Sequence, residues 1–222
     1  MLKQIIFISA LMAAFLNAHA QSSSAPFGVT GTITPGACSV ALTGGVVNLG
    51  TLSAATVKAY GQASGVYHFP GVNLPISITC GAPTKVEASF IDNHTSDKYV
   101  LDQNDVVRFG IVDGAGTKGI GFYTMIFSNT TIDNVAVGQF LNAPNGTANW
   151  TSTVPGTGVP AIYASHNNTI GFSKTAGATT PDSFTTLTGT LSFQSYASIN
   201  YVNNATTAIA LNGSGTLTLV YL

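Results

Sequence analysis

The stretch that decides the fold is N-G-S-G-T-L-T-L-V-Y-L, residues Asn212–Leu222. Its first four residues favour a turn, and the rest alternates Thr with Leu and then ends in V-Y-L, which predicts a strand with one buried face. Successive side chains of a strand point to opposite faces, so Leu217, Leu219 and Tyr221 are expected to lie on the same side. The sequence stops inside this apolar strand, whereas most domains end in polar residues. At the edge of a sheet, such a strand would offer unpaired N–H and C=O groups to another chain.

Composition excludes several classes of partner. The chain has 222 residues, of which 45% are hydrophobic and 7% are charged, against about 25% charged in an average soluble domain. The net charge is −1, and Arg108 is the single arginine. Nucleic acids and anionic membranes are bound by clusters of Lys and Arg, so we expect neither as a partner.

The first 20 residues have the pattern of an export signal. Lys3 supplies the positive charge, residues 5–16 are apolar, and Ala18-His19-Ala20 fits the cleavage pattern A-x-A. We therefore expect an exported protein without membrane insertion, with residues 21–222 forming a single domain. An ordinary first core helix is the alternative interpretation of the apolar run.

Two cysteines, Cys38 and Cys80, lie 42 residues apart. Oxidising compartments favour a disulfide between them, which would stabilise the fold by about 4 kcal/mol in the chain-entropy model. A two-cysteine metal site is the alternative, but no histidine lies near either cysteine at ligand spacing. The sequence thus favours the disulfide.

Alternating apolar and polar residues predict many other short strands. The ranges are 27–34, 46–52, 74–80, 86–90, 106–112, 120–127 and 185–199, with weaker strands near Val135, at 161–163 and at 208–211. The first of them would present Phe27, Val29, Gly31 and Ile33 to the core. Residues 53–71 are expected to form a connecting loop, and no window of the mature chain has helical periodicity. The pattern predicts an all-β fold, and specifically a β-sandwich.

The order of several motifs resembles a known family. The motifs are an export signal, V-T-G-T-I-T-P-G-A-C (29–38), L-P-I-S-I-T-C (74–80), A-P-T-K-V (82–86), G-I-G-F-Y (119–123) and L-N-G-S-G-T-L-T-L-V-Y-L (211–222). Together they resemble the β-fimbria-like proteins, which carry a domain of unknown function and are related to pilins of the chaperone–usher pathway.

This resemblance implies an immunoglobulin-like β-sandwich that is incomplete because it lacks its last, seventh strand. In such pilins a periplasmic chaperone lends the strand, and the N-terminal extension of a neighbouring subunit later replaces it. Cys38 and Cys80 would match the family disulfide, Gly31 a glycine of the first strand, and residues 217, 219 and 221 the alternating C-terminal motif. The chain departs from the pattern in having only Q-S-S-S-A-P before the first strand and in having Ile209 where pilins have glycine.

The resemblance makes a structural subunit or minor pilin of a fimbria the leading hypothesis. Its expected partners are a periplasmic chaperone, an usher and other fimbrial subunits, and its expected location is the periplasm in transit and then the cell surface. A self-contained secreted β-sandwich is the alternative, binding carbohydrate or a host surface through loops near Trp150 and Tyr163. A structural role for Trp150, half-buried against the sandwich, is the other interpretation of this segment.

Motifs for catalysis are weak in this chain. Residues 114–119 match G-x-G-x-x-G, but a strand-like segment follows them where a dinucleotide site needs a helix, so a hairpin turn is expected. Asp92 and His94 lack a G-x-S-x-G serine, and the seven Asp residues and the single Glu87 show no spacing typical of a glycosidase. We expect no enzyme activity, no cofactor and no metal site; a secreted hydrolase is the weakest alternative.

Overall fold

The structure is a computed structural model that describes residues 36–95, 106–153 and 161–222, which all belong to the compact unit Pro35–Leu222. The export signal and the first predicted strand, with Phe27, Val29, Gly31 and Ile33, lie outside the described residues. Within them, strands predominate and every paired strand is antiparallel. The predicted all-β class is confirmed.

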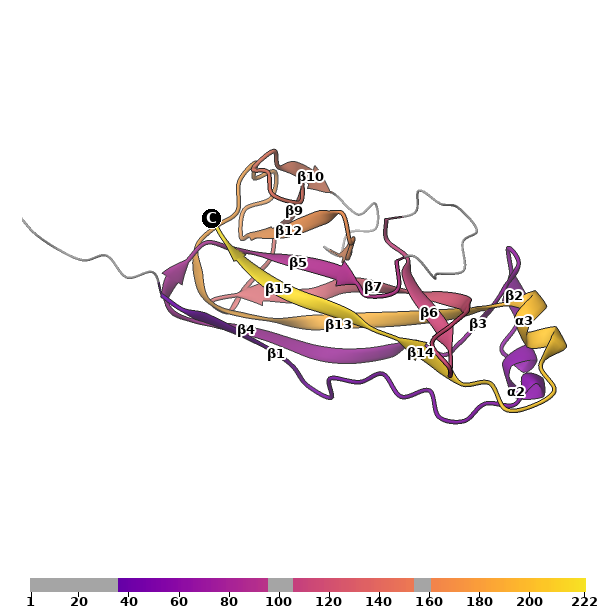
Figure 1. The fold of residues 1–222 in the computed structure, drawn as a ribbon. Helices are drawn as coiled ribbons and strands as arrows, with labels where there is room; N and C mark the ends of the chain where they lie inside the picture. The colour runs from indigo at the N-terminus through magenta and orange to yellow at the C-terminus, as the bar shows by residue number, and fades with distance from the viewer. Residues whose placement is uncertain (1–35, 96–105, 154–160) are drawn as a thin grey trace, which may run out of the picture. The chain divides into compact units, whose positions relative to one another are not determined.

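The larger sheet contains ten strands (Figure 1). Its main path runs in the order β1 (Cys38–Leu42), β4 (Val72–Thr84), β13 (Phe184–Ser198), β7 (Gly119–Ile132), β6 (Phe109–Asp113) and β14 (Leu211–Gly213). Four short strands pair beside this path: β2 (Gln62–Ala63), β3 (Val66–His68), β8 (Val135–Ala136) and β11 (Ile162–Tyr163). β1 is therefore one edge of the path and β14 is the other.

The smaller sheet has five strands. Its order is β10 (Thr151–Thr153), β9 (Gln139–Pro144), β12 (Asn168–Ser173), β5 (Val86–Asp92) and β15 (Gly215–Tyr221). The predicted terminal strand is thus present, as β15, and it lies at a sheet edge. The turn expected at Asn212–Gly215 is wrong: the chain stays extended there, pairs with β6 as β14, and after Ser214 continues in the other sheet as β15.

The two sheets share one apolar core. Phe127 of β7 packs edge-on against Phe90 of β5 and Phe172 of β12, with ring centroids 5.9 and 5.7 Å apart. All three rings are at most 2% exposed. Edge-to-face aromatic pairs of this kind add stabilisation beyond the area that they bury.

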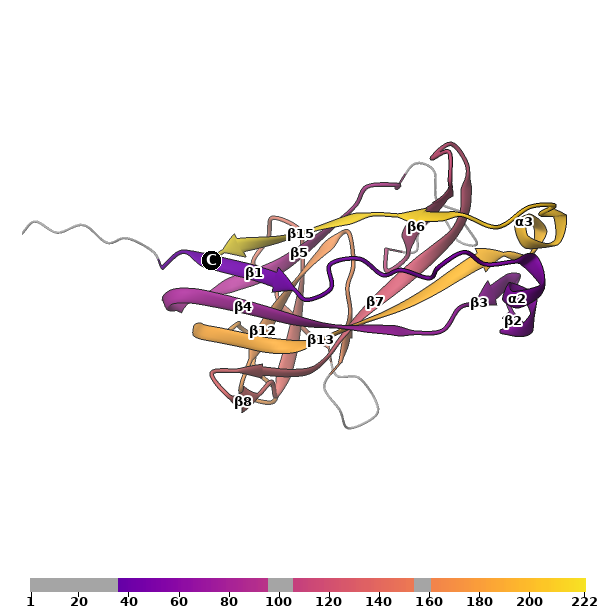
Figure 2. The ribbon, with the colours of Figure 1, turned by 90° about the horizontal axis from the view of Figure 1, so that it is seen from below.

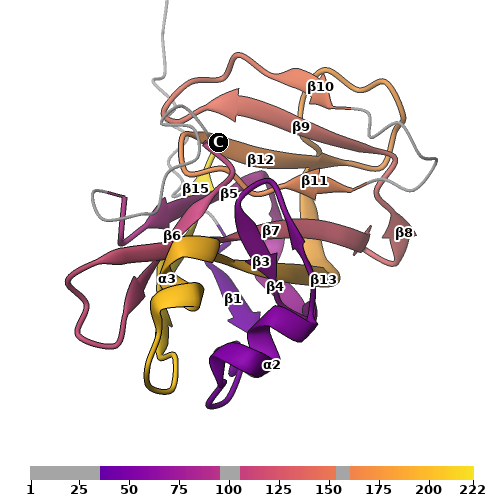
Figure 3. The ribbon, with the colours of Figure 1, turned by 90° about the vertical axis from the view of Figure 1, so that its right-hand side faces the viewer.

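Two short helices lie beside β3 and build a second, smaller core (Figure 3). They are α2 (Ala54–Ala59) and α3 (Ile199–Asn204), and the buried Val57 and Val202 are their core residues. Ser53 caps α2, because its hydroxyl accepts a hydrogen bond from the Thr56 N–H at 3.1 Å. The connecting loop expected at residues 53–71 is therefore wrong, since this segment holds a helix and two strands.

Other strand predictions also need correction. Residues 46–52 form no strand; Leu52 alone makes an isolated bridge with Ile209. β9 and β12 were not expected as strands, because both bury side chains on their two faces and so lack the period-two pattern. The weaker strands near Val135 and at 161–163 are present as β8 and β11.

Candidate strand-pairing site

Among the described residues, β15 pairs on one side only, with β5. The register matches Leu217 with Phe90 and Leu219 with Ala88. Flanking hydrogen bonds join Asn93 N–H to Ser214 O and Leu222 N–H to Lys85 O, both at 3.2 Å. Because hydrogen-bonded pairs alternate along an antiparallel ladder, the even-numbered residues of β15 bond to β5. The N–H and C=O groups of the odd-numbered residues, 215 to 221, therefore point to the open side of the strand.

The inward side chains of β15 are incompletely covered. Leu217 and Leu219 pack against the main core but are only half-buried, and Tyr221 is 47% exposed. Their partners on β5 are at most 2% exposed. The two strands face the same core, and no strand of the described residues lies beside β15 on its open side, which accounts for the difference in burial.

β1, at the edge of the other sheet, also has inward side chains that are incompletely buried. Val40 is 36% exposed and Leu42 is half-buried, while their partners Ile78 and Ile76 are buried. Hydrogen bonds from Gly81 N–H to Ala37 O and from Thr43 N–H to Pro75 O show that the odd-numbered residues of β1 bond to β4. The backbone groups of residues 38, 40 and 42 consequently face away from β4.

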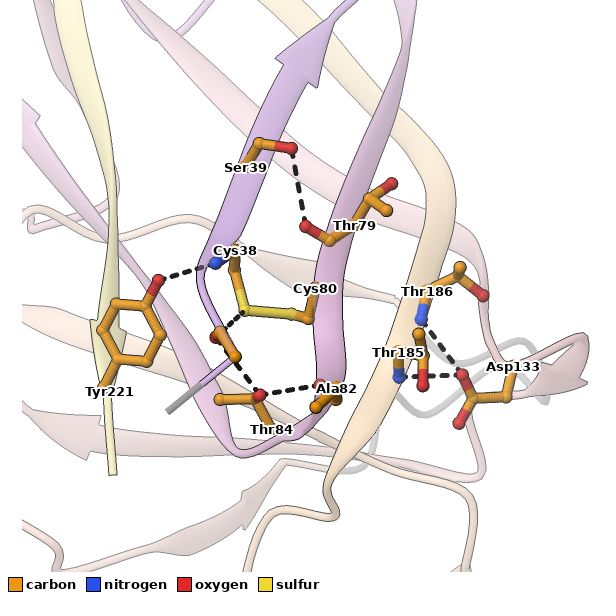
Figure 4. The surroundings of a disulfide bond; sticks show 11 residues. Cys38, Ser39, Thr79, Cys80, Ala82, Thr84, Asp133, Thr185, Thr186 and Tyr221 are labelled. Carbon is orange, nitrogen blue, oxygen red and sulfur yellow. Dashed lines mark hydrogen bonds between the residues drawn. A yellow bond between two sulfur atoms is a disulfide. The ribbon is translucent and has the colours of Figure 1, made fainter. Parts of the chain in front are cut away.

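β1 and β15 lie next to each other, and one contact joins them directly (Figure 2). The backbone N–H of Cys38 donates a hydrogen bond of 2.7 Å to the phenolic oxygen of Tyr221. Cys38 also forms the predicted disulfide with Cys80, which lies directly opposite it on β4 (Figure 4). The disulfide is thus confirmed, and it fixes β1 to the larger sheet at the point where Tyr221 reaches it.

A cavity of about 500 Å³ lies farther along this open side. It is bounded by the start of β15, with Thr216 and Leu217, and by residues 45–50, which follow β1. Its walls include apolar side chains from the main core: Phe90, Phe109, Ile111, Tyr123, Met125 and Leu191. The arrangement can receive apolar side chains from outside the described residues.

Tyr123 closes one wall of this cavity. Its ring stacks on Phe109 with centroids 5.3 Å apart. A Cβ atom would lie 3.0 Å from the Tyr123 ring if added at Gly213, and 3.0 Å from the Tyr123 hydroxyl oxygen if added at Gly215. The two glycines thus let the β14–β15 backbone pass close to Tyr123 without displacing its side chain. Burial, together with the charge of Asp92, raises the pKa of Tyr123 far above its usual range, so the hydroxyl stays protonated.

Alternation within β6 and β7 could have pointed to the cavity walls, because Phe109 and Ile111, and likewise Tyr123 and Met125, are two residues apart and face the core. The sequence does not indicate that the facing wall comes from residues 45–50. That wall depends on where the chain runs after β1, which no local pattern specifies.

Of the predicted ligand residues, Trp150 lies just before β10 and packs against the smaller sheet, whereas Tyr163 belongs to the larger sheet. Trp150 is half-buried, and its ring lies against Gly171 of β12. Tyr163 in β11 pairs with Ile126 of β7 and is 51% exposed. The contacts seen for these two residues are therefore with different sheets.

The other motifs have structural roles in the described chain. Residues 114–119 connect the paired strands β6 and β7, as expected for a hairpin. The Asp92 carboxylate is buried and accepts hydrogen bonds from the backbone N–H groups of His94 and Gly110, each at 3.0 Å. It does not orient a histidine ring in this arrangement.

The described residues contain neither a candidate metal site nor a candidate membrane-spanning helix. Among residues 36–95, 106–153 and 161–222, no group of three or more His, Cys, Asp or Glu side chains could hold a metal ion. Neither α2 nor α3, the helices of this described part, is long and apolar enough to cross a membrane.

Comparison with known protein families assigns the chain to one of them. Residues 27–140, just over half of the 222, match the family described as "Protein of unknown function (DUF1120)". The chain belongs to the DUF1120 family. It is also similar to Protein GltF of Escherichia coli (strain K12), with 29% identity over 111 residues. That match covers 48% of this chain and 44% of GltF. The DUF1120 match includes β1, β4 and β5 but ends before β15.

Proposed function

We propose that this DUF1120 protein is a structural subunit or minor pilin of a cell-surface fimbria. Its fold would be an immunoglobulin-like β-sandwich with one strand missing, which another polypeptide supplies. The observation that carries the proposal is the incomplete burial of the inward side chains on both β1 and β15, the two edges that meet at the open side.

Backbone geometry supports an incoming strand as the occupant. Leu217 and Leu219 of β15 present N–H and C=O groups along the edge that no described residue pairs with, and the backbone groups of Val40 in β1 face away from β4. An extended segment satisfies such groups by adding to the sheet, while alternate side chains enter pockets and give selectivity. The neighbouring 500 Å³ cavity offers such a pocket.

Burial energetics explain why the partner would matter. Covering the exposed parts of Leu217, Leu219 and Tyr221 would contribute a few kcal/mol, at about 25 cal/mol per Å² of apolar surface. Folded domains are stable by only about 5–15 kcal/mol. The donated strand would therefore make a substantial contribution to the stability of the assembled subunit.

Export fits this assembly route. The leader pattern of residues 1–20 predicts passage into the periplasm, and the Cys38–Cys80 disulfide is typical of oxidising compartments. A periplasmic chaperone would lend the strand first, and an usher and other subunits would follow at the cell surface.

Co-expression with a periplasmic chaperone of the chaperone–usher class from the source organism tests the proposal. We expect a one-to-one complex by native mass spectrometry. Replacing Leu217 and Leu219 by serine should reduce its yield at least about tenfold, because the two leucines contact the incoming strand. The matched control is Thr216→Ala with Thr218→Ala on the opposite face of β15, which should keep the complex.

Equal yields of complex from the leucine and threonine variants would contradict the proposal. A folded monomer that forms no complex with such a chaperone would contradict it as well.

The carbohydrate-binding alternative has less structural support. It relies on Trp150 and Tyr163 forming one surface, but the Trp150 ring packs against Gly171 of the smaller sheet and Tyr163 belongs to the larger sheet. Tyr163 keeps an exposed ring, so oligosaccharide binding that is lost in a Tyr163→Ala variant and retained in a Trp150→Phe variant would favour this alternative.

A further inference from the structure

Residues 44–50, G-G-V-V-N-L-G, form a strap across the cavity beside β15. The strap begins after β1 and ends before the isolated bridge between Leu52 and Ile209. The strap belongs to no strand, although its residues Val46, Val47 and Leu49 are of types that favour one.

Hydrogen bonds hold the strap at its ends. On one side Thr43 N–H donates to Pro75 O at 2.9 Å, and on the other Ile209 N–H donates to Leu52 O at 2.9 Å. Between these anchors, the bonds seen in the described chain are local: Gly45 N–H to Leu42 O, Val46 N–H to Gly44 O, and Gly50 N–H to the Asn48 side chain. Within the described chain, the strap therefore lines the cavity without pairing with β15.

Apolar side chains keep the strap in place. Val47 and Leu49 are half-buried and line the cavity, whereas Val46 between the glycines and Val47 is 77% exposed. The cavity beside them is many times larger than the roughly 30 Å³ occupied by one water molecule, so these side chains line it without filling it.

Glycines at both ends allow the strap to move. Gly44, Gly45 and Gly50 have φ angles of +92°, +47° and +71°. Most other residues adopt positive φ angles only at a cost in free energy, whereas glycine can change between positive and negative φ. The backbone can therefore change direction on either side of Val47 and Leu49.

We propose that residues 44–50 are a displaceable cover of the strand-accepting site, an inference that rests on the proposed function. In the free subunit, Val47 and Leu49 shield the cavity from water. An incoming strand replaces them, and the strap swings away on its glycines. The rate of strand uptake is then set by opening of the strap.

A Gly50→Ala variant tests this directly. A Cβ atom at Gly50 would meet no atom within 4 Å, so alanine disfavours only the left-handed backbone of the closed strap. The matched control is Gly146→Ala, with φ +75° and equally open space, in the turn between β9 and β10. The probe is a fluorescent synthetic peptide of the strand that the periplasmic chaperone would lend, and its association is followed by anisotropy.

Gly50→Ala should speed peptide association about tenfold, the effect expected from a left-handed alanine, while Gly146→Ala should match the unaltered protein. Equal rates for all three proteins would overturn the inference and leave the proposed function standing. Binding to none of them would count against both. Should Gly50→Ala fail to fold by circular dichroism, Val47→Ser tests the same point, with the exposed Val46→Ser as its control.

Discussion

Tyr221 of β15 accepts a hydrogen bond from the backbone N–H of Cys38 in β1, at 2.7 Å and across 183 residues of sequence. The bond joins the edges of two different sheets where the described residues contain no strand between them. It closes one end of the open side, while the cavity and its strap lie toward the other end.

Replacing Tyr221 by phenylalanine removes the hydrogen bond between β1 and β15 and should destabilise the fold. One hydrogen bond contributes about 0.5–1.5 kcal/mol, so we expect a loss of that size in the free energy of unfolding, measured with urea. Tyr60→Phe is the control, because Tyr60 is 41% exposed and its hydroxyl makes no hydrogen bond within the described chain. Equal stability of the two variants would show that the Tyr221 contact contributes nothing.

Removing the disulfide should have a larger effect. Replacing Cys38 and Cys80 by serine removes the link between β1 and β4, and we expect a loss of about 4 kcal/mol for a loop of this length. Urea unfolding of the variant, and of the unaltered protein with and without reductant, measures it. If reduction leaves the unfolding midpoint unchanged, the disulfide does not hold β1 in place.

Glu87 should make stability fall as pH rises. It is 2% exposed, and Oε2 has no hydrogen-bond partner among the described residues. Burial raises the pKa of Glu87, and a hydrogen bond from Thr169 only partly opposes this shift. The folded protein then holds the proton more tightly than the unfolded chain. The protonated Glu87 carboxyl therefore stabilises the folded state. This stabilisation is fully present below the pKa that Glu87 has in the unfolded chain, and it is lost as pH rises through the higher pKa that Glu87 has in the folded protein.

A Glu87→Gln variant should therefore be more stable than the unaltered protein at pH 7, and the gain should shrink at pH 4. Asp113 is the control of opposite sign: backbone hydrogen bonds, first from Thr117 and also from Lys118, lower its pKa. Asp113→Asn should lower stability at pH 7. Urea unfolding of both variants at the two pH values measures the change, and a loss of stability at pH 7 in Glu87→Gln would contradict the account.

The sequence predicted the features that depend on local pattern. The strand at 215–221, the Cys38–Cys80 pairing and the hairpin at 114–119 follow from alternation, cysteine count and glycine turns. β9 and β12 escaped prediction because Phe140, Leu141, Ile170 and other side chains are buried on both faces of their strands.

The candidate site was predictable only in part. Leu217, Leu219 and Tyr221 follow from the alternation, whereas the course of residues 44–50 depends on tertiary contacts of Val47 and Leu49. Their V-V-N-L letters favour a strand, but no neighbour in the described chain pairs with them, and the flanking glycines turn the backbone instead.

Residue-resolved hydrogen exchange of the isolated protein tests the central claim most directly. If the open side lacks a strand, the amide N–H groups of Leu217 and Leu219 exchange rapidly, while those of Thr218 and Val220, which bond to β5, are protected. Binding of a complementing strand should then protect the two leucine amides as well. Slow exchange at Leu217 and Leu219 in the isolated monomer would contradict the account, because it would mean that a strand of the same chain already occupies this edge.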